Sequence, residues 1–139
     1  MTTRSTYSSN LDKQASGDDQ ANAKRVIDTH IKDLWELEDG WKGAGSLAPT
    51  APAKAFFELY WDGLSSSYWT ESTPSATAAG GLSMQWERDK RGYTADILPG
   101  GELQLTVTET NPADNAELLI AEPTPVMLRK FVMRGLPID

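Results

Sequence analysis

The spacing of apolar residues changes at Gly80-Gly81, and this change constrains the fold more than any other feature of the sequence. Before the two glycines, apolar residues recur every three or four positions, as on one face of a helix. After them, apolar and polar residues alternate, as in strands with one buried and one exposed face. Packing helices against a sheet satisfies both patterns at once. The sequence therefore predicts an α+β fold with one shared hydrophobic interior.

Two antiparallel helices are predicted in the N-terminal half of the chain. The first extends over about residues 19–39, and the second starts near Thr50, with Pro52 in its first turn, where a missing amide costs nothing. Between them, Gly40 is typical of the left-handed residue that ends a helix, and Trp41 is placed to pack back on the last turn. The residues predicted to face inward are Ile27, His30, Ile31, Leu34 and Leu37 in the first helix, and Ala53, Phe56, Phe57, Tyr60, Trp61 and Leu64 in the second.

An antiparallel meander of three to four strands is predicted after Gly81. Its alternating segments are residues 82–87, 93–97 and 102–108, followed by a fourth short strand over about residues 117–121. Residues 89–92 are typical of a hairpin turn, in which Gly92 would supply the left-handed conformation.

A C-terminal helix is predicted over residues 126–134, with Thr124 as its N-cap and Pro125 as its first residue. Val and Phe also favour strands, so a β continuation stays open here. The predicted architecture is two N-terminal helices and a C-terminal helix packed on one face of the meander.

Composition separates a tail from a domain. Residues 1–19 are dominated by Ser, Thr, Asn, Gln and Asp, and they hold too little apolar surface to offset the entropy of ordering. We predict a disordered polar tail there, and a single α+β domain over residues 20–139. The absence of cysteine and the single histidine, His30, disfavour disulfides and metal sites, so no cofactor is expected. Without an apolar leader or a run of membrane-spanning length, the sequence predicts a cytoplasmic protein with no membrane association.

The net charge of −7 argues against direct binding to nucleic acid, which needs a basic footprint. No lysine or arginine occurs between Gly92 and Leu128. This stretch is either a solvated acidic face that aids solubility or an acidic surface for a basic partner. The acidic residues within it are Asp96, Glu102, Glu109, Asp114, Glu117 and Glu122.

Two motifs resemble those of a known group of proteins. Residues 40–45 read Gly-Trp-Lys-Gly-Ala-Gly and are followed by Pro49 or Pro52, and residues 80–86 read Gly-Gly-Leu-Ser-Met-Gln-Trp. Together they resemble a loosely defined group of small, largely uncharacterised bacterial α+β proteins that share a G-W-x-G-x-G/A…P corner and a G-G-x-x-x-x-W strand. The resemblance covers about residues 34–105. It implies a compact α+β domain and transfers no catalytic residue.

The sequence holds no recognisable catalytic set. His30 is the only imidazole, and no G-x-S-x-G elbow occurs. Glu87 and Asp96 could face each other across the first hairpin, as a glycosidase pair requires, but such carboxylates are far more often surface charges. The glycines at positions 43–45 follow a helix and no strand, so they disfavour a phosphate-binding loop. We predict that the protein is not an enzyme.

The leading hypothesis is a non-enzymatic protein-binding module, such as an inhibitor, an antitoxin-like protein or a phage-encoded anti-defence protein. Its contacts would come from the acidic sheet face, an edge strand, or a loop with exposed aromatic residues. The candidate partner-binding residues are Tyr68, Trp69, Glu87, Asp96, Glu102, Gln104, Glu109, Asp114 and Glu117.

Two alternatives stay open. One is a small-molecule-binding domain or weak enzyme with a pocket between the second helix and the sheet, near Trp41, Tyr60, Trp61 and Trp86. The other is an acidic nucleic-acid mimic that occupies a basic groove, which requires its carboxylates to share one surface. A homodimer through an unpaired sheet edge is compatible with every hypothesis.

Overall fold

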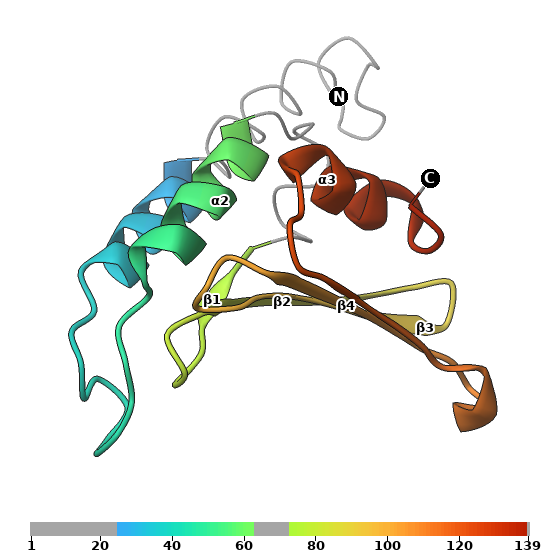
Figure 1. Cartoon of the computed structure of the whole chain (residues 1–139), viewed down its shortest axis with the longest axis horizontal. Helices are drawn as coiled ribbons and strands as arrows, with labels where there is room; N and C mark the ends of the chain where they lie inside the picture. Colours follow the sequence, from blue (N-terminus) through green and yellow to red (C-terminus); the bar gives the residue numbers. More distant parts are fainter. Residues whose placement is uncertain (1–24, 63–72, 139) are drawn as a thin grey trace, which may run out of the picture.

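A computed structural model of the chain describes residues 25–62 and 73–138 (Figure 1). These residues form an antiparallel five-stranded sheet with helices on one side. An α+β fold is confirmed, and the sheet has more strands than the three to four predicted. The predictions for the tail over residues 1–19, for Leu64 and for the aromatic pair Tyr68 and Trp69 lie outside the described residues.

The sheet is a simple meander in the order β1-β2-β3-β4-β5. The unpredicted strand is the first one, which lies in a stretch of small polar residues that sequence patterns assign to a loop. It forms because Thr77 donates its amide to the Gly81 carbonyl and accepts from the Gly81 amide through Oγ1. The strands are β1 (Ser75–Ala76), β2 (Leu82–Arg88), β3 (Arg91–Ile97), β4 (Leu103–Thr108) and β5 (Ala116–Ile120).

The hairpin between β2 and β3 closes through a shorter turn than predicted. Asp89 and Lys90 are its two central residues, and both have positive φ, at 54° and 66°. Gly92 lies inside β3 opposite Glu87, so it does not supply the left-handed conformation. A two-residue turn with positive φ at both positions fits the right-handed twist of the strands. Asp tolerates this conformation better than most residues.

The first helix is helical over residues 25–35 within the described chain, and it runs antiparallel to α2 (Ala51–Asp62) as predicted (Figure 1). The indole N–H of Trp61 donates to Asp28 Oδ1 at 3.1 Å and ties the end of α2 to the first helix. The predicted end of the first helix at Asp39 is wrong. The amide of Glu36 already bonds three residues back, and this tighter bonding ends the α-helical ladder.

The corner between the two helices is held by hydrogen bonds. Gly40, with φ of 91°, lies in a turn beyond the helix and does not cap it. Trp41 stays outside the hydrophobic core, which corrects the prediction that it packs on the last helical turn. Its indole N–H donates to the Leu47 carbonyl at 2.8 Å. The buried Ser46 hydroxyl accepts from the Lys42 amide. These bonds, made within the loop, fix the corner in place of apolar packing.

The second and the C-terminal helix begin where the sequence predicts. Thr50 Oγ1 accepts from the Ala53 amide at the start of α2. Thr124 caps α3 (Pro125–Arg134) by accepting from the Met127 amide, and Pro125 is the first helical residue. The segment that the sequence left open between helix and strand is therefore a helix.

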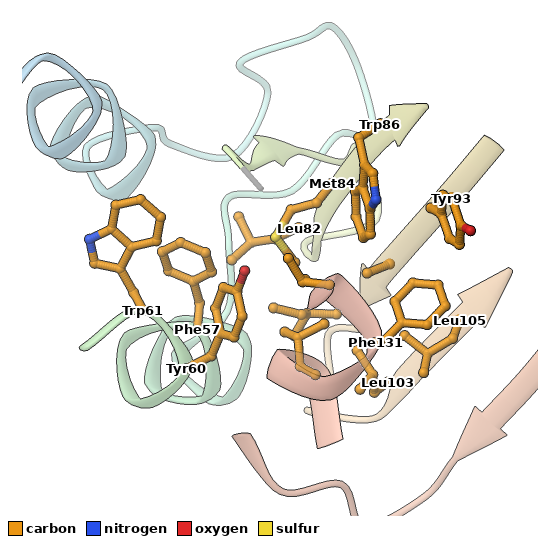
Figure 2. Close-up of a cluster of buried hydrophobic side chains, with 14 of the residues drawn as sticks. Phe57, Tyr60, Trp61, Leu82, Met84, Trp86, Tyr93, Leu103, Leu105 and Phe131 are labelled. Carbon is orange, nitrogen blue, oxygen red and sulfur yellow. The ribbon is translucent and has the colours of Figure 1, made fainter. Parts of the chain in front are cut away.

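The interior is one cluster shared by helices and sheet (Figure 2). Two aromatic groups lie within it. Phe57 stacks on Trp61 in α2, with ring centroids 5.6 Å apart. Tyr93 stacks on Trp86 across the hairpin, and Phe131 of α3 meets both rings edge-on. The predicted shared interior is confirmed, because Phe57 and Trp61 of α2 lie in one cluster with Leu82, Met84 and Trp86 of β2.

Candidate protein-binding surface

The face of the sheet that points away from the helices is here named the outer face. No described element lies over it in Figure 1. Strand register aligns its residues in rows, for example Gln85, Thr94, Thr106 and Glu117. The residues of the outer face are Ser75, Ser83, Gln85, Glu87, Gly92, Thr94, Asp96, Gln104, Thr106, Thr108, Glu117 and Leu119.

The charged residues of the outer face are all acidic. They are Glu87, Asp96 and Glu117, and no lysine or arginine of the described strands points to this side. Glu87 and Asp96 do not face each other, because Glu87 pairs with Gly92 and Asp96 with Ser83. Four strand positions separate their rows, roughly 13 Å along the sheet. The predicted carboxylate pair is therefore not formed, and the outer face is a dispersed acidic surface.

The other predicted acidic residues lie outside the strands. Glu109 follows β4 on the helix side, where its Oε1 accepts from Arg91 Nε at 2.9 Å. This hydrogen bond is the main cause that raises the pKa of the Arg91 guanidinium above its ordinary value. Asp114 ends the 3-10 helix η2 (Pro112–Asp114), and Glu102 lies in the turn before β4. Because Glu109 lies on the helix side whereas Asp96 and Glu117 lie on the outer face, the predicted carboxylates do not all share one surface, as a nucleic-acid mimic requires.

The strand β5 forms one edge of the sheet and exposes apolar side chains. Leu119, on the outer face, is 62% exposed, and Leu118, on the helix side, is 38% exposed. The apolar helix-side residues of β2, β3 and β4 are buried. The strand β5 lies beyond the region that the helices cover, and its residues are mostly exposed. Apolar edge strands are uncommon because they invite pairing with another chain. The sequence indicated an edge strand in general terms and did not indicate which strand.

Two hydrogen bonds establish which backbone groups of β4 face β5. The amide of Leu98 donates to the Glu102 carbonyl across the β3–β4 turn. The backbone N–H and C=O groups of the even-numbered residues of β4 therefore point toward β3. The amide of Glu109 donates to Oδ1 of Asn115, which directly precedes β5. The backbone N–H and C=O groups of the odd-numbered residues of β4 therefore point toward β5. Successive residues of a strand bond to opposite neighbours. The β5-facing residues of β4 are therefore Leu103, Leu105 and Val107.

The same alternation identifies the free groups of β5. Leu105 of β4 pairs with Leu118, so the backbone of Leu118 bonds inward. Glu117 and Leu119, on either side of it, point their N–H and C=O groups away from the sheet. No element of the described chain lies beyond β5 to accept or donate to these groups. The edge thus offers four backbone groups beside an exposed leucine and a carboxylate.

The opposite edge of the sheet is short. Strand β1 has two residues, and Ser75 donates its hydroxyl to the Ser83 carbonyl there. Short edge strands are one way in which proteins limit unwanted pairing. Only β5 therefore combines length, apolar side chains and outward amides among the described strands.

The pocket proposed between α2 and the sheet is not formed by its four residues. Trp41 lies outside the core, whereas Tyr60, Trp61 and Trp86 are buried in it. A hollow of about 560 Å³ lies instead between the first helix and α2, lined in part by Trp35 and Trp61. The described residues contain no group of three His, Cys, Asp or Glu side chains that could hold a metal ion. Within the same ranges, no helix is both long enough and apolar enough to cross a membrane.

Comparisons of the chain with protein-family models, curated proteins and solved structures give no match. The case for a functional site therefore comes from the geometry of the chain itself.

Proposed function

We propose that the protein is a non-enzymatic protein-binding module whose contact surface is β5 together with the adjoining part of the outer face. The observation that carries this proposal is the exposed edge of β5, where Leu119 is 62% exposed beside outward-pointing backbone groups. Inhibitors, antitoxin-like proteins and anti-defence proteins act by such binding alone and need no catalytic group.

The contrast between the two edges supports this proposal. Edge strands are normally kept short, charged or covered, and β1 follows this rule. β5 instead exposes two leucines in succession. An apolar centre with a polar surround is typical of the surfaces through which proteins bind one another.

The shape and charge of the outer face favour a protein partner over other ligands. Its acidic residues repel phosphate backbones. Its hollow around Gly92 has a volume of about 270 Å³. Pockets for small molecules usually hold about 300–1,000 Å³ and enclose most of the ligand. A polar face without a deep pocket, next to an apolar edge, suits a protein surface better.

Affinity capture with matched variants tests the proposal. The full-length protein, a Glu117→Lys/Leu119→Thr double variant and a Val126→Thr control are immobilised and exposed to a lysate of the source organism. Val126 is an exposed apolar residue in the first turn of α3, which belongs to the helix layer and not to the sheet. We expect a stoichiometric partner on the wild type and on the control, and its loss from the double variant. No partner, or equal capture by all three proteins, would refute the proposal.

A further inference from the structure

Resting on the proposed function, we infer that the partner binds by β-strand addition. An extended segment of the partner pairs along β5, with a lysine or arginine beside Glu117 on the outer face and an apolar side chain beside Leu118 on the helix side.

The backbone of β5 sets this binding mode. Glu117 and Leu119 each present one N–H and one C=O outward, and an added strand would lie about 4.8 Å away in the plane of the sheet. Main-chain hydrogen bonds then provide affinity for any extended segment. Selectivity comes from the side chains that flank these bonds.

The side chains differ between the two sides of β5. On the outer face, Glu117 accepts one long hydrogen bond within the described part of the chain, from Gln104 Nε2 at 3.5 Å, so most of its acceptor capacity stays available for a cation. On the helix side, Leu118 is 38% exposed and would be covered by an apolar residue. The added strand should therefore alternate basic and apolar residues.

The distribution of charge assigns the basic residues to the outer face. The flanks of β5 carry Asp114 and Glu122, and the sequence from Gly92 to Leu128 has no lysine or arginine. The basic groups near β5 are on its helix side, where Arg91 and Arg134 line a hollow of about 190 Å³ with Ala116. Basic side chains of a partner would be repelled there and attracted on the outer face.

The same charges disfavour a second copy of the chain on this edge. Each copy has a net charge of −7, and pairing β5 with β5 brings acidic flanks together. Like charges across a strand pair or between two copies are destabilising. A basic segment is the complementary occupant.

A defined peptide tests the backbone part of this inference. The probe is a heptapeptide of alternating lysine and valine, capped at both ends, added to the isotope-labelled full-length protein. We expect the largest changes in the NMR spectrum at the amides of Glu117 and Leu119. Leu119→Pro removes one outward N–H without removing a bond inside the sheet, as proline is tolerated on edge strands. It should weaken Kd about tenfold, or about 1.4 kcal/mol, whereas Leu119→Val, which keeps the amide, should not.

A second set of variants tests the charge part. Glu117→Gln keeps the shape of the side chain and should weaken Kd about threefold while reducing its dependence on salt. Glu58→Gln removes another exposed carboxylate, on α2, and should leave Kd unchanged. A peptide with glutamate in place of lysine should not bind. This set does not depend on whether Leu119→Pro folds.

The outcomes separate this inference from the proposed function. Peptide binding that maps away from β5, or that Leu119→Pro and Glu117→Gln do not weaken, overturns strand addition by a basic segment. A concentration-dependent dimer in sedimentation, lost in Leu119→Pro, assigns the edge to a second copy and also overturns it. If the captured partner is lost from the double variant but binds Leu119→Pro and Leu119→Val equally, the proposed function stands and strand addition fails.

Discussion

The two faces of the sheet share one backbone and lie in different environments. On the helix side, Ala95 and Leu105 are fully buried under the helices, whereas Thr94 and Thr106, their neighbours in sequence, are partly exposed on the outer face. The helix side holds the apolar contacts that stabilise the fold. The outer face and β5 contribute little burial and remain available to a partner. Substitutions should therefore separate stability from binding according to the face that they change.

The largest effect is expected on the helix side at Phe57. Its fully buried ring stacks on Trp61 and meets the edge of Trp35. Phe57→Ala should lower the free energy of unfolding by about 3–5 kcal/mol, because a cavity replaces these contacts. Thr106→Ala on the outer face should change it by less than about 0.5 kcal/mol. Chemical denaturation of both variants measures the difference, and equal losses would contradict the division between faces.

The next effect is expected at Arg88, where the sheet caps a helix. Its guanidinium donates to the carbonyls of Val132 at 2.7 Å and Met133 at 3.2 Å, near the C-terminus of α3. These carbonyls lack helical partners, and a cation is favourable at this end of the helix. Arg88→Met should cost about 1–3 kcal/mol. Lys90→Met, in the neighbouring turn, is the control, and a loss of the same size there would show that charge alone matters.

A smaller effect should distinguish two buried tryptophans. Trp86 is 8% exposed, and its indole N–H has no hydrogen-bond partner among residues 25–62 and 73–138, whereas that of Trp61 donates to Asp28. An unpaired buried donor is destabilising, so replacing it offsets part of the lost packing. Trp86→Phe should be less destabilising than Trp61→Phe by about 1 kcal/mol. Thermal or urea unfolding decides this, and the reverse order would indicate that Trp86 donates to a partner.

The smallest effect on stability is expected at the edge of the sheet. Leu119→Thr places a β-branched polar residue at an exposed position and should change the free energy of unfolding by less than about 0.5 kcal/mol. The same change should weaken binding of the captured partner. Unfolding and capture are measured on one preparation. A loss of stability without a loss of binding would place Leu119 among the structural residues.

Local patterns allowed much of the fold to be predicted. The alternation after Gly81 indicated which residues of β2, β3 and β4 are buried, and Thr124 with Pro125 indicated the start of α3. These features depend on neighbours in sequence. Their physical causes are the two-residue period of strands and the unpaired amides at a helix start.

Features that depend on distant contacts were missed. The strand β1 exists because residues 75–76 pair with residues 82–83, and composition alone suggests a loop there. The position of Trp41 was missed for a different, local reason: its indole N–H donates to the Leu47 carbonyl within the same loop, and no residue pattern indicates that bond.

The candidate surface was predicted only in outline. The acidic stretch was visible in the sequence. The sequence did not indicate that its carboxylates are divided between the two sides of the sheet, because the pairing of Glu109 with Arg91 depends on how two strands align. The sequence also did not indicate that β5 is the longer exposed edge, since that follows from the strand order. The predicted aromatic residues Tyr68 and Trp69 remain a hypothesis outside the described residues.

Amide hydrogen exchange along β5, measured in dilute solution of the free protein, tests the central claim most directly. Leu118 and Ile120 bond to β4 and should exchange slowly, whereas Glu117 and Leu119 should exchange nearly as fast as unstructured amides. Addition of the captured partner should protect Glu117 and Leu119 and leave the other pair unchanged. Slow exchange of all four amides in the free protein would contradict the account, because the edge of β5 would then already be occupied.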